Sequence, residues 1–242
     1  MERKINSRLQ ELRKRGSIDD EVYQQLRVSQ NCTRPALFYG LPKIHKPNAP
    51  LRPIVSYVNH ALYATSKYLA KLLSPFSRTF PSFVQDSTHL CEILKDVEID
   101  NDHVLVSFDV KSLYTSVPID RAMESVRSLL ESDQSWKTMT DLTAEEVLDL
   151  LSVCLKESSF KYRDRFYHMT SGLAMGSPVS PVVANIFVSQ LEQSSIATLT
   201  TKPRLWLRFV NIFYRLSEKF GLIRHCATST VSMTIYRFFV RE

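Results

Sequence analysis

Cysteine and long apolar runs are both scarce in this 242-residue sequence. The four cysteines (Cys32, Cys91, Cys154 and Cys226) stand far apart, and without a Cys-x-x-Cys pair they indicate neither a zinc site nor a disulfide framework. No run reaches the length of a membrane span, and the first residues lack the apolar core of a signal peptide. We therefore expect an intracellular protein, nuclear or cytoplasmic, that is neither secreted nor membrane-bound.

Glycine is also scarce, with 5 residues against 11 prolines, which argues against low-complexity disorder. With 44% hydrophobic residues, the chain can bury the core of one large domain or two modest ones. Lys and Arg outnumber Asp and Glu by 14 to 5 in residues 1–80 and by 8 to 2 in residues 201–242, whereas residues 81–200 hold 9 basic and 18 acidic residues. This distribution suits a protein that binds a polyanion through its basic terminal regions, although a basic surface can also simply aid solubility.

Hydrophobic periodicity predicts an α+β protein. Helices are expected over residues 5–15, 19–28, 59–73, 86–97, 119–131, 143–157 and 180–191. Thr143 and Glu146 form a capping box in this prediction. Strands are expected at 104–108 and 205–210, with a hairpin over 160–168 that turns at Arg163-Asp164. Five prolines within residues 32–53 predict that this segment holds no helix and no central strand.

Asp109 closes the apolar run Val104–Phe108 within the segment Ser107-Phe-Asp-Val-Lys-Ser-Leu-Tyr114. A carboxylate there is poorly solvated unless a cation pairs with it, and Mg²⁺ is a natural partner when the substrate is a nucleoside triphosphate. Alternatively, Asp109 caps the following turn or pairs with an arginine, the commoner role of a single aspartate after a strand. Tyr114 can lie under an incoming sugar or be an ordinary core tyrosine.

The segment from Gly172 to Phe187 is a glycine- and proline-rich turn that leads into a helix. Its small residues, Gly172, Gly176 and Ser177 before Pro178, allow a base or sugar to approach the backbone closely. Exposed amides at a helix N-terminus also favour phosphate. The alternative is a purely structural strand-to-helix turn.

A second proline-rich region carries fixed cations: Lys43, His45 and Lys46 in Phe38–Pro47, and Arg52 in Leu51–Ser56. Cations on a rigid scaffold with nearby aromatic residues suit contacts with a triphosphate or a template backbone, or they form a solvated basic loop. His45 has no partner at metal-ligand spacing, so we do not predict it as a metal ligand.

Together these segments resemble a reverse transcriptase, most closely that of Penelope-like retroelements, over about residues 5–210. The resemblance implies a right-hand polymerase fold with fingers and a partial palm, an antiparallel sheet packed on helices and no recognisable thumb. It divides the chain into a helical extension (1–31), fingers and palm (32–210) and a divergent tail (211–242). It also implies Mg²⁺ as cofactor, deoxynucleoside triphosphates as substrates, and an RNA template with a DNA primer; the oligomeric state is left open.

The resemblance also implies roles for single residues. Asp109 would be the catalytic metal ligand. Nucleotide-binding roles fall on Arg52, Lys43, Tyr114 and Gly176, and template or primer contacts on Lys46, Gly172, Ser177, Pro178 and Asn185. Asn185 belongs to the Ser-Pro-x-x-Ala-Asn run of the family, which spans Ser180–Asn185 here.

The sequence departs from the family where an aromatic-x-Asp-Asp turn is expected. Trp206–Val210 leads directly into Asn211-Ile-Phe213, and no aspartate occurs after Asp164. One carboxylate would then face two metal ions that normally share three, and electrostatic positioning carries most of the catalysis in phosphoryl transfer. We therefore expect an RNA-directed DNA polymerase that is truncated and impaired, with a tail that resembles a frameshifted or alternatively joined end.

Two other functions remain open from the sequence. The chain can be a non-enzymatic nucleic-acid-binding protein that uses its basic fingers, or an unproductive remnant that folds poorly. An RNA-directed RNA polymerase is disfavoured, because a bulky residue at Tyr114 would exclude ribonucleotides.

Overall fold

The computed structural model of the chain describes residues 1–29, 33–44, 46–97, 103–110, 112–199, 202–209, 212–218 and 233–238. The described strands form two four-stranded sheets. Their bounds are β1 Ala36–Pro42, β2 Leu51–Ser56, β3 His103–Val110, β4 Ser159–Tyr162, β5 Arg165–His168, β6 Leu205–Phe209, β7 Ile212–Glu218 and β8 Met233–Phe238.

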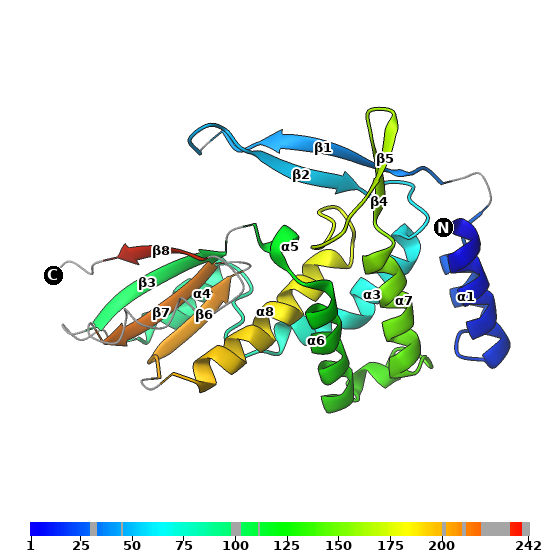
Figure 1. Ribbon diagram of the computed structural model, residues 1–242. Helices are drawn as coiled ribbons and strands as arrows, with labels where there is room; N and C mark the ends of the chain where they lie inside the picture. The colour runs from blue at the N-terminus through cyan, green and yellow to red at the C-terminus, as the bar shows by residue number, and fades with distance from the viewer. Residues whose placement is uncertain are drawn as a thin grey trace.

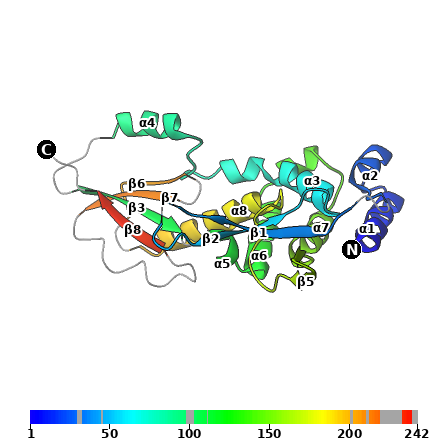
Figure 2. The ribbon, with the colours of Figure 1, turned by 90° about the horizontal axis from the view of Figure 1, so that it is seen from above.

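Most of the helices lie below the first sheet and beside the second (Figure 1). Their bounds are α1 Glu2–Arg15, α2 Asp20–Leu26, α3 Tyr63–Leu73, α4 Ser87–Lys95, α5 Leu113–Ser116, α6 Ile119–Ser132, α7 Ala144–Lys156 and α8 Ser180–Ala197, with 3-10 turns η1 Pro75–Arg78 and η2 Ser135–Thr138. Viewed from above, α1 and α2 lie at one end of the molecule and the sheet with β3 lies at the other (Figure 2). None of the described helices is long and apolar enough to cross a membrane.

Local sequence signals account for where several helices begin and end. Thr143 accepts a hydrogen bond from the Glu146 amide while the Glu146 carboxylate accepts one from the Thr143 amide, so the predicted capping box of α7 is confirmed. α1 ends at Gly16, whose φ of 76° lets its amide turn back onto the last carbonyls. α8 extends to Ala197, beyond the predicted end at residue 191.

The first sheet has the strand order β2–β1–β4–β5, in which β1 and β4 are parallel and the other pairs antiparallel. The predicted hairpin at Arg163-Asp164 is confirmed as the turn between β4 and β5, where Arg163 has a φ of 52°. Figure 1 shows this hairpin rising above β1.

The prediction that residues 32–53 contain no central strand is wrong, because β1 lies between β2 and β4. The prolines occupy positions where a strand tolerates a missing N–H. Pro42 is the last residue of β1, Pro53 lies on the outer strand β2, and Pro47 and Pro50 fall in the connection between these strands.

The second sheet is antiparallel throughout, in the order β6–β7–β3–β8. Residues 82–84 run beside β6, where the Arg208 amide donates to the Ser82 carbonyl at 2.6 Å and the Val84 amide donates to the Arg208 carbonyl at 2.9 Å. Both β7 and β8 come from residues 211–242, the region that the sequence set apart as a divergent tail. The division of the chain at residue 210 stays a prediction.

The hydrophobic core joins the helices to both sheets. Val126 of α6, Leu151 of α7 and Ile186 of α8 are fully buried where these helices pack together, and α3 packs against α7 and α8. The predicted α+β architecture, with an antiparallel sheet packed on helices, is confirmed.

Candidate functional site

Three segments that are far apart in the sequence meet at one place through their backbones. The Val55 amide of β2 donates to the Met175 carbonyl at 2.8 Å. The Leu173 amide donates to the Tyr114 carbonyl at 2.7 Å. The Gly172–Phe187 turn therefore connects the proline-rich strand β2 to the segment that follows Asp109.

The two glycines of the turn are required by these contacts. Gly172 has a φ of 78°, and a Cβ there would lie 2.8 Å from the Thr115 carbonyl oxygen. Gly176 has a φ of 129°, and a Cβ there would lie 2.3 Å from the Val55 carbonyl oxygen. The fold of the chain itself thus explains both glycines, without a base or sugar against the backbone.

Asp109 lies near the end of β3, beside the β6–β7 hairpin. It pairs with Ile212 of β7 on one side and with Thr234 of β8 on the other. β6 and β7 pair through Phe209 and Ile212, so the two residues that connect them are Val210 and Asn211, which lie outside the described residues. The backbone register therefore places Ile212, the first residue of β7, next to Asp109.

The described residues do not fit a site for two metal ions held by three carboxylates. Among them, no group of three His, Cys, Asp or Glu side chains could hold a metal ion together. Asp109 brings one carboxylate, and the sequence has no aspartate or glutamate in the hairpin from Leu205 to Leu216. We therefore derive no catalytic step through Mg²⁺.

Tyr114 lies in the short helix α5, half-buried against the hydrophobic core. Burial raises the pKa of its hydroxyl, so the side chain is neutral at physiological pH. Ser112, three residues after Asp109, has a φ of 52° and turns the chain from β3 into α5. The role of Tyr114 as a sugar gate stays a prediction.

The predicted cations lie on the β1–β2 hairpin. Lys46 and Arg52 are exposed and Lys43 is half-buried, with the Lys43 amide donating to the Pro50 carbonyl at 2.9 Å. Arg52 pairs with Leu41 across the two strands. Figure 1 shows this hairpin extending over α5. The predicted exclusion of His45 as a metal ligand concerns a residue outside the described part of the chain.

The other predicted template residues lie around the start of α8. Ser177 is buried, and its hydroxyl has no hydrogen-bond partner among the described residues. Pro178 follows it in the turn that leads into α8. Asn185 points its amide oxygen at the Arg208 guanidinium, 3.2 Å from Nη1. Template contacts by these three residues stay predictions.

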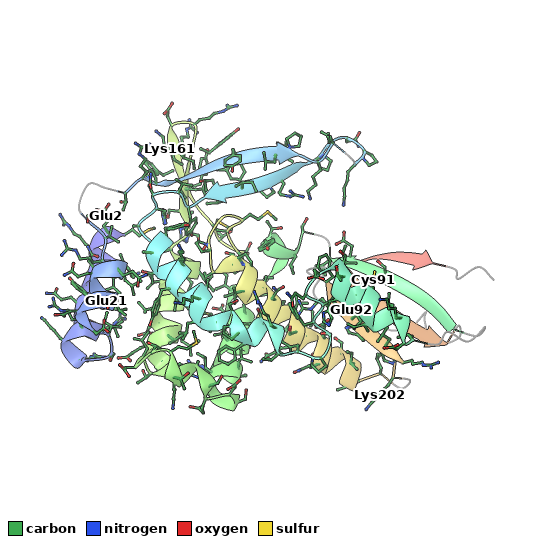
Figure 3. The ribbon with its side chains drawn as sticks, turned by 180° about the vertical axis from the view of Figure 1, so that it is seen from behind. Glu2, Glu21, Cys91, Glu92, Lys161 and Lys202 are labelled. Atoms are coloured by element: carbon green, nitrogen blue, oxygen red, sulfur yellow. The ribbon has the colours of Figure 1, made fainter. Side chains whose placement is uncertain are left out.

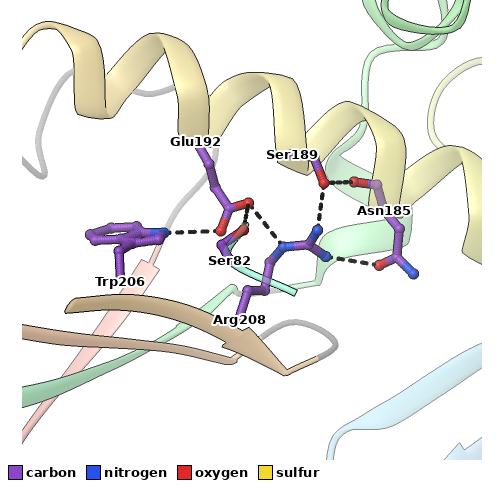
Figure 4. Close-up of polar contacts among 6 residues, drawn as sticks. All are labelled: Ser82, Asn185, Ser189, Glu192, Trp206 and Arg208. Atoms are coloured by element: carbon purple, nitrogen blue, oxygen red, sulfur yellow. Dashed lines mark hydrogen bonds and ion pairs between the residues drawn. The ribbon is translucent and has the colours of Figure 1, made fainter. Parts of the chain in front are cut away.

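A buried polar network joins α8 to β6 (Figure 4). None of the sequence-based predictions included it. Arg208, 1% exposed, donates from Nε to Glu192 Oε2 at 3.1 Å and from Nη2 to the Ser189 hydroxyl. Glu192, 5% exposed, also accepts from the Ser82 hydroxyl at 2.9 Å and from the Trp206 indole N–H at 3.0 Å. A buried ion pair with its remaining hydrogen-bonding groups satisfied holds the strand in one position.

Two signals in the sequence could have revealed this network. Arg208 interrupts the apolar strand Leu205–Phe209, and Glu192 is the one charged residue in the apolar helix α8. Because Arg and Glu are rarely buried unless they are paired, each residue predicts a partner for the other. The network holds β6 against α8 at Arg208, the residue before Phe209. It therefore helps to position the β6–β7 hairpin beside Asp109.

The sequence profile of the family described as "Reverse transcriptase (RNA-dependent DNA polymerase)" matches residues 44–210. This range includes β2, Asp109, the Gly172–Phe187 turn and the Arg208 network. The chain therefore belongs to the reverse transcriptase family. A search of curated proteins found no match.

Solved structures of polymerases share the fold. Telomerase from Candida tropicalis, truncated from its C-terminal domain, is 14% identical with a TM-score of 0.61, covering 88% of this chain and 52% of that one. Telomerase from Candida albicans, in complex with a fragment of telomeric RNA, is 14% identical with a TM-score of 0.56, covering 83% and 39%. An RNA polymerase complex inside a double-stranded RNA virus is 9% identical with a TM-score of 0.53, covering 95% and 22%. The chain thus spans about half or less of the length of these proteins.

Proposed function

We propose that this chain is the reverse transcriptase domain of a Penelope-like retroelement and that its nucleotidyl transfer is impaired. In the unimpaired reaction, the primer 3′-hydroxyl would attack the α-phosphorus of an incoming deoxynucleoside triphosphate on an RNA template and release pyrophosphate, and Mg²⁺ held by carboxylates would stabilise the developing negative charge. This chain would bind the primer, the template and the nucleotide, but it would lack the carboxylates that hold both ions. As an RNA-directed DNA polymerase it would be inactive or nearly so.

The position of the β6–β7 hairpin is the observation that carries this proposal. Asp109 pairs with Ile212, so the hairpin end is where further carboxylates would have to lie to share a metal ion with Asp109. The connecting residues are Val210 and Asn211, neither of which is acidic. A single carboxylate carries one negative charge, so it neither neutralises two divalent ions nor completes their coordination.

A primer-extension assay on an RNA template with a DNA primer, Mg²⁺ and deoxynucleotides tests the proposed impairment. We expect the unchanged chain to extend the primer no faster than an Asp109→Asn variant. A circular-dichroism melt of both proteins checks that each is folded. Extension that depends on Asp109 would overturn the proposed impairment.

A second function, non-enzymatic binding of nucleic acid, is favoured by the exposed cations of the β1–β2 hairpin. We expect the triple substitution of Lys43, Lys46 and Arg52 by Gln to weaken primer-template binding roughly tenfold at low salt and to reduce the dependence of affinity on salt. Substituting Lys14, Lys67 and Lys71 by Gln removes the same charge from exposed helix positions and serves as the control. Equal losses for the two variants would show that the hairpin makes no specific contribution.

A further inference from the structure

The first sheet carries an unusual share of exposed apolar surface. Of the twelve exposed large apolar side chains among the described residues, seven lie on its strands. They are Leu37, Tyr39, Leu41, Leu51, Tyr162, Phe166 and Tyr167. A concentration of exposed apolar side chains on one element marks an interaction surface.

The outermost part of this sheet, residues 159–168 of β4, β5 and their turn, is here called the aromatic hairpin. Phe166 is 69% exposed, Tyr167 44% and Tyr162 39%, so three rings reach solvent. The hairpin rises away from the helical body in Figure 1, and Lys161 marks it in the rear view (Figure 3). The described structure gives no reason within the fold for these rings to be exposed.

Part of the aromatic hairpin is held rigid by ring stacking. Phe160 stacks on Phe38 of β1 at 5.2 Å between ring centroids and on Tyr167 at 5.7 Å, and Tyr162 meets Phe38 edge-on at 5.4 Å. The row of rings extends across β1, β4 and β5 and ends at the exposed Tyr167. A fixed, partly exposed ring is a preformed platform for a second planar group.

Charge indicates what kind of partner the platform fits. The hairpin carries Lys161, Arg163 and Arg165 against one acid, Asp164, which lies 3.4 Å from Lys161. Within the described residues, Arg163 and Arg165 have no acidic partner, and the Arg163 guanidinium lies 5.4 Å from the Tyr162 ring centroid. Exposed rings interleaved with free guanidinium groups match the bases and phosphates of a single-stranded nucleic acid.

A second copy of the chain fits this surface less well. β5 is the outer strand of the sheet, so it could pair with another strand. In an antiparallel pair of two copies centred on Arg165, however, the two arginines would lie opposite each other, and like charges oppose such pairing.

We propose that the aromatic hairpin binds unpaired single-stranded nucleic acid, with bases stacked on Tyr162 and Tyr167, which share one face of the sheet, and phosphates held by Arg163 and Arg165. The inference rests on the proposed function in one respect, namely that the chain binds nucleic acid. The hairpin is a separate surface from the β1–β2 cations and requires no polymerisation. An unpaired strand held there would extend the contact of the protein with a template beyond the paired region.

Fluorescence anisotropy with a labelled twelve-nucleotide oligo-uridine and its oligo-deoxythymidine counterpart tests this proposal on the full chain. We expect Tyr162→Ala with Tyr167→Ala to weaken binding about tenfold, because the stacking of bases on these two rings is lost. Arg163→Gln with Arg165→Gln should make the negative slope of log affinity against log salt concentration shallower by about 1.4, which is 0.7 for each phosphate contact of a single strand. Lys67→Gln with Lys71→Gln on α3 is the charge-matched control and should leave affinity within twofold.

Each other outcome is also decisive. Equal losses for the arginine pair and the α3 control would mean nonspecific charge attraction and would overturn the proposal. Sedimentation equilibrium that shows a dimer lost in the Tyr162/Tyr167 variant, with oligonucleotide affinity unchanged, would assign the surface to self-association instead. The proposed function fails separately, because the oligonucleotide assay uses no primer and no nucleotide, and its variants leave Lys43, Lys46 and Arg52 unchanged. The melting temperature of the arginine variant should match that of the unchanged chain, since both arginines are exposed. That of the ring variant should fall slightly, because Tyr162 and Tyr167 pack on Phe38 and Phe160.

Discussion

The Arg208 network and the Asp109 site lie in the same sheet with only β7 between their strands, yet they are built very differently. Around Arg208, a buried guanidinium, a carboxylate and their hydrogen-bonding neighbours are mutually satisfied. Around Asp109, the described residues provide no three-ligand cluster, and the adjoining sequence from Leu205 to Leu216 has no acid. The interactions that position the hairpin are therefore independent of the groups that would perform chemistry, so chemistry can be lost while the fold persists.

Breaking the network should give the largest change in stability. We expect Glu192→Ala to lower the free energy of unfolding by about 3–5 kcal/mol, because it leaves a buried guanidinium without its counter-ion. Urea denaturation monitored by tryptophan fluorescence measures the change. Lys156→Ala, which breaks an exposed pair with Asp120 at 2.8 Å, is the control and should barely move the midpoint. Equal effects of the two substitutions would remove the distinction between the network and an ordinary surface pair.

The junction that brings the site segments together should be the next most sensitive. Gly176→Ala would place a Cβ against the Val55 carbonyl and strain a φ of 129°, and we expect a loss of about 2–3 kcal/mol. Gly16→Ala is the matched control, with a φ of 76° and nothing within 4 Å, and should cost about 1 kcal/mol from backbone strain alone. A Gly176→Ala protein no less stable than Gly16→Ala would contradict the described contact with β2.

Acid sensitivity should arise outside both clusters. Burial, reinforced by the N-terminal ammonium group, lowers the pKa of His60 to about 4. The unfolded chain, with a pKa near 6.5, therefore takes up this proton first, and stability falls as pH drops from about 6.5 towards 4. We expect a loss of about 2 kcal/mol by pH 5 that is missing in His60→Gln, measured by urea denaturation across pH. The same slope in both proteins would mean that a group other than His60 titrates instead.

The smallest expected effect belongs to a feature that the sequence shows directly. Thr143→Ala removes the side-chain cap of α7 and should cost about 1 kcal/mol, read from the shift of the urea midpoint. A loss as large as that of Glu192→Ala would show that local caps, rather than the network, dominate the stability of this fold.

Local signals explain what could be predicted from the sequence. The capping box at Thr143 and the turn at Arg163-Asp164 depend on residues close in the chain, and both were predicted correctly. The central strand β1 was not predicted, because the prolines of residues 32–53 argued against the backbone hydrogen bonds of a strand inside a sheet. In the fold these prolines lie at the end of a strand, on an outer strand and in a loop. Local propensity could not reveal which side of each strand would be paired.

Long-range pairing explains what the sequence could not supply at the site. Gly176 was predicted as a place for a nucleotide to approach, and only the structure shows the Val55 carbonyl against it. Arg208 and Glu192 are 16 residues apart, and neither shows its partner until α8 packs on β6. Asp109 was identified by its motif, and its position beside Ile212 could be found only from the strand register.

The most direct test replaces Asn211 by two aspartates, which lengthens the chain by one residue and leaves the rest unchanged. It asks whether the fold around Asp109 is complete and only the metal-binding carboxylates are missing. Primer extension on an RNA template with Mg²⁺ is the measurement, beside the unchanged chain and the same replacement carrying Asp109→Asn. We expect extension to rise by about 100-fold or more over the unchanged chain and to be lost again with Asp109→Asn. A folded two-aspartate protein that is as inactive as the unchanged chain would contradict the claim that the framework around Asp109 is intact.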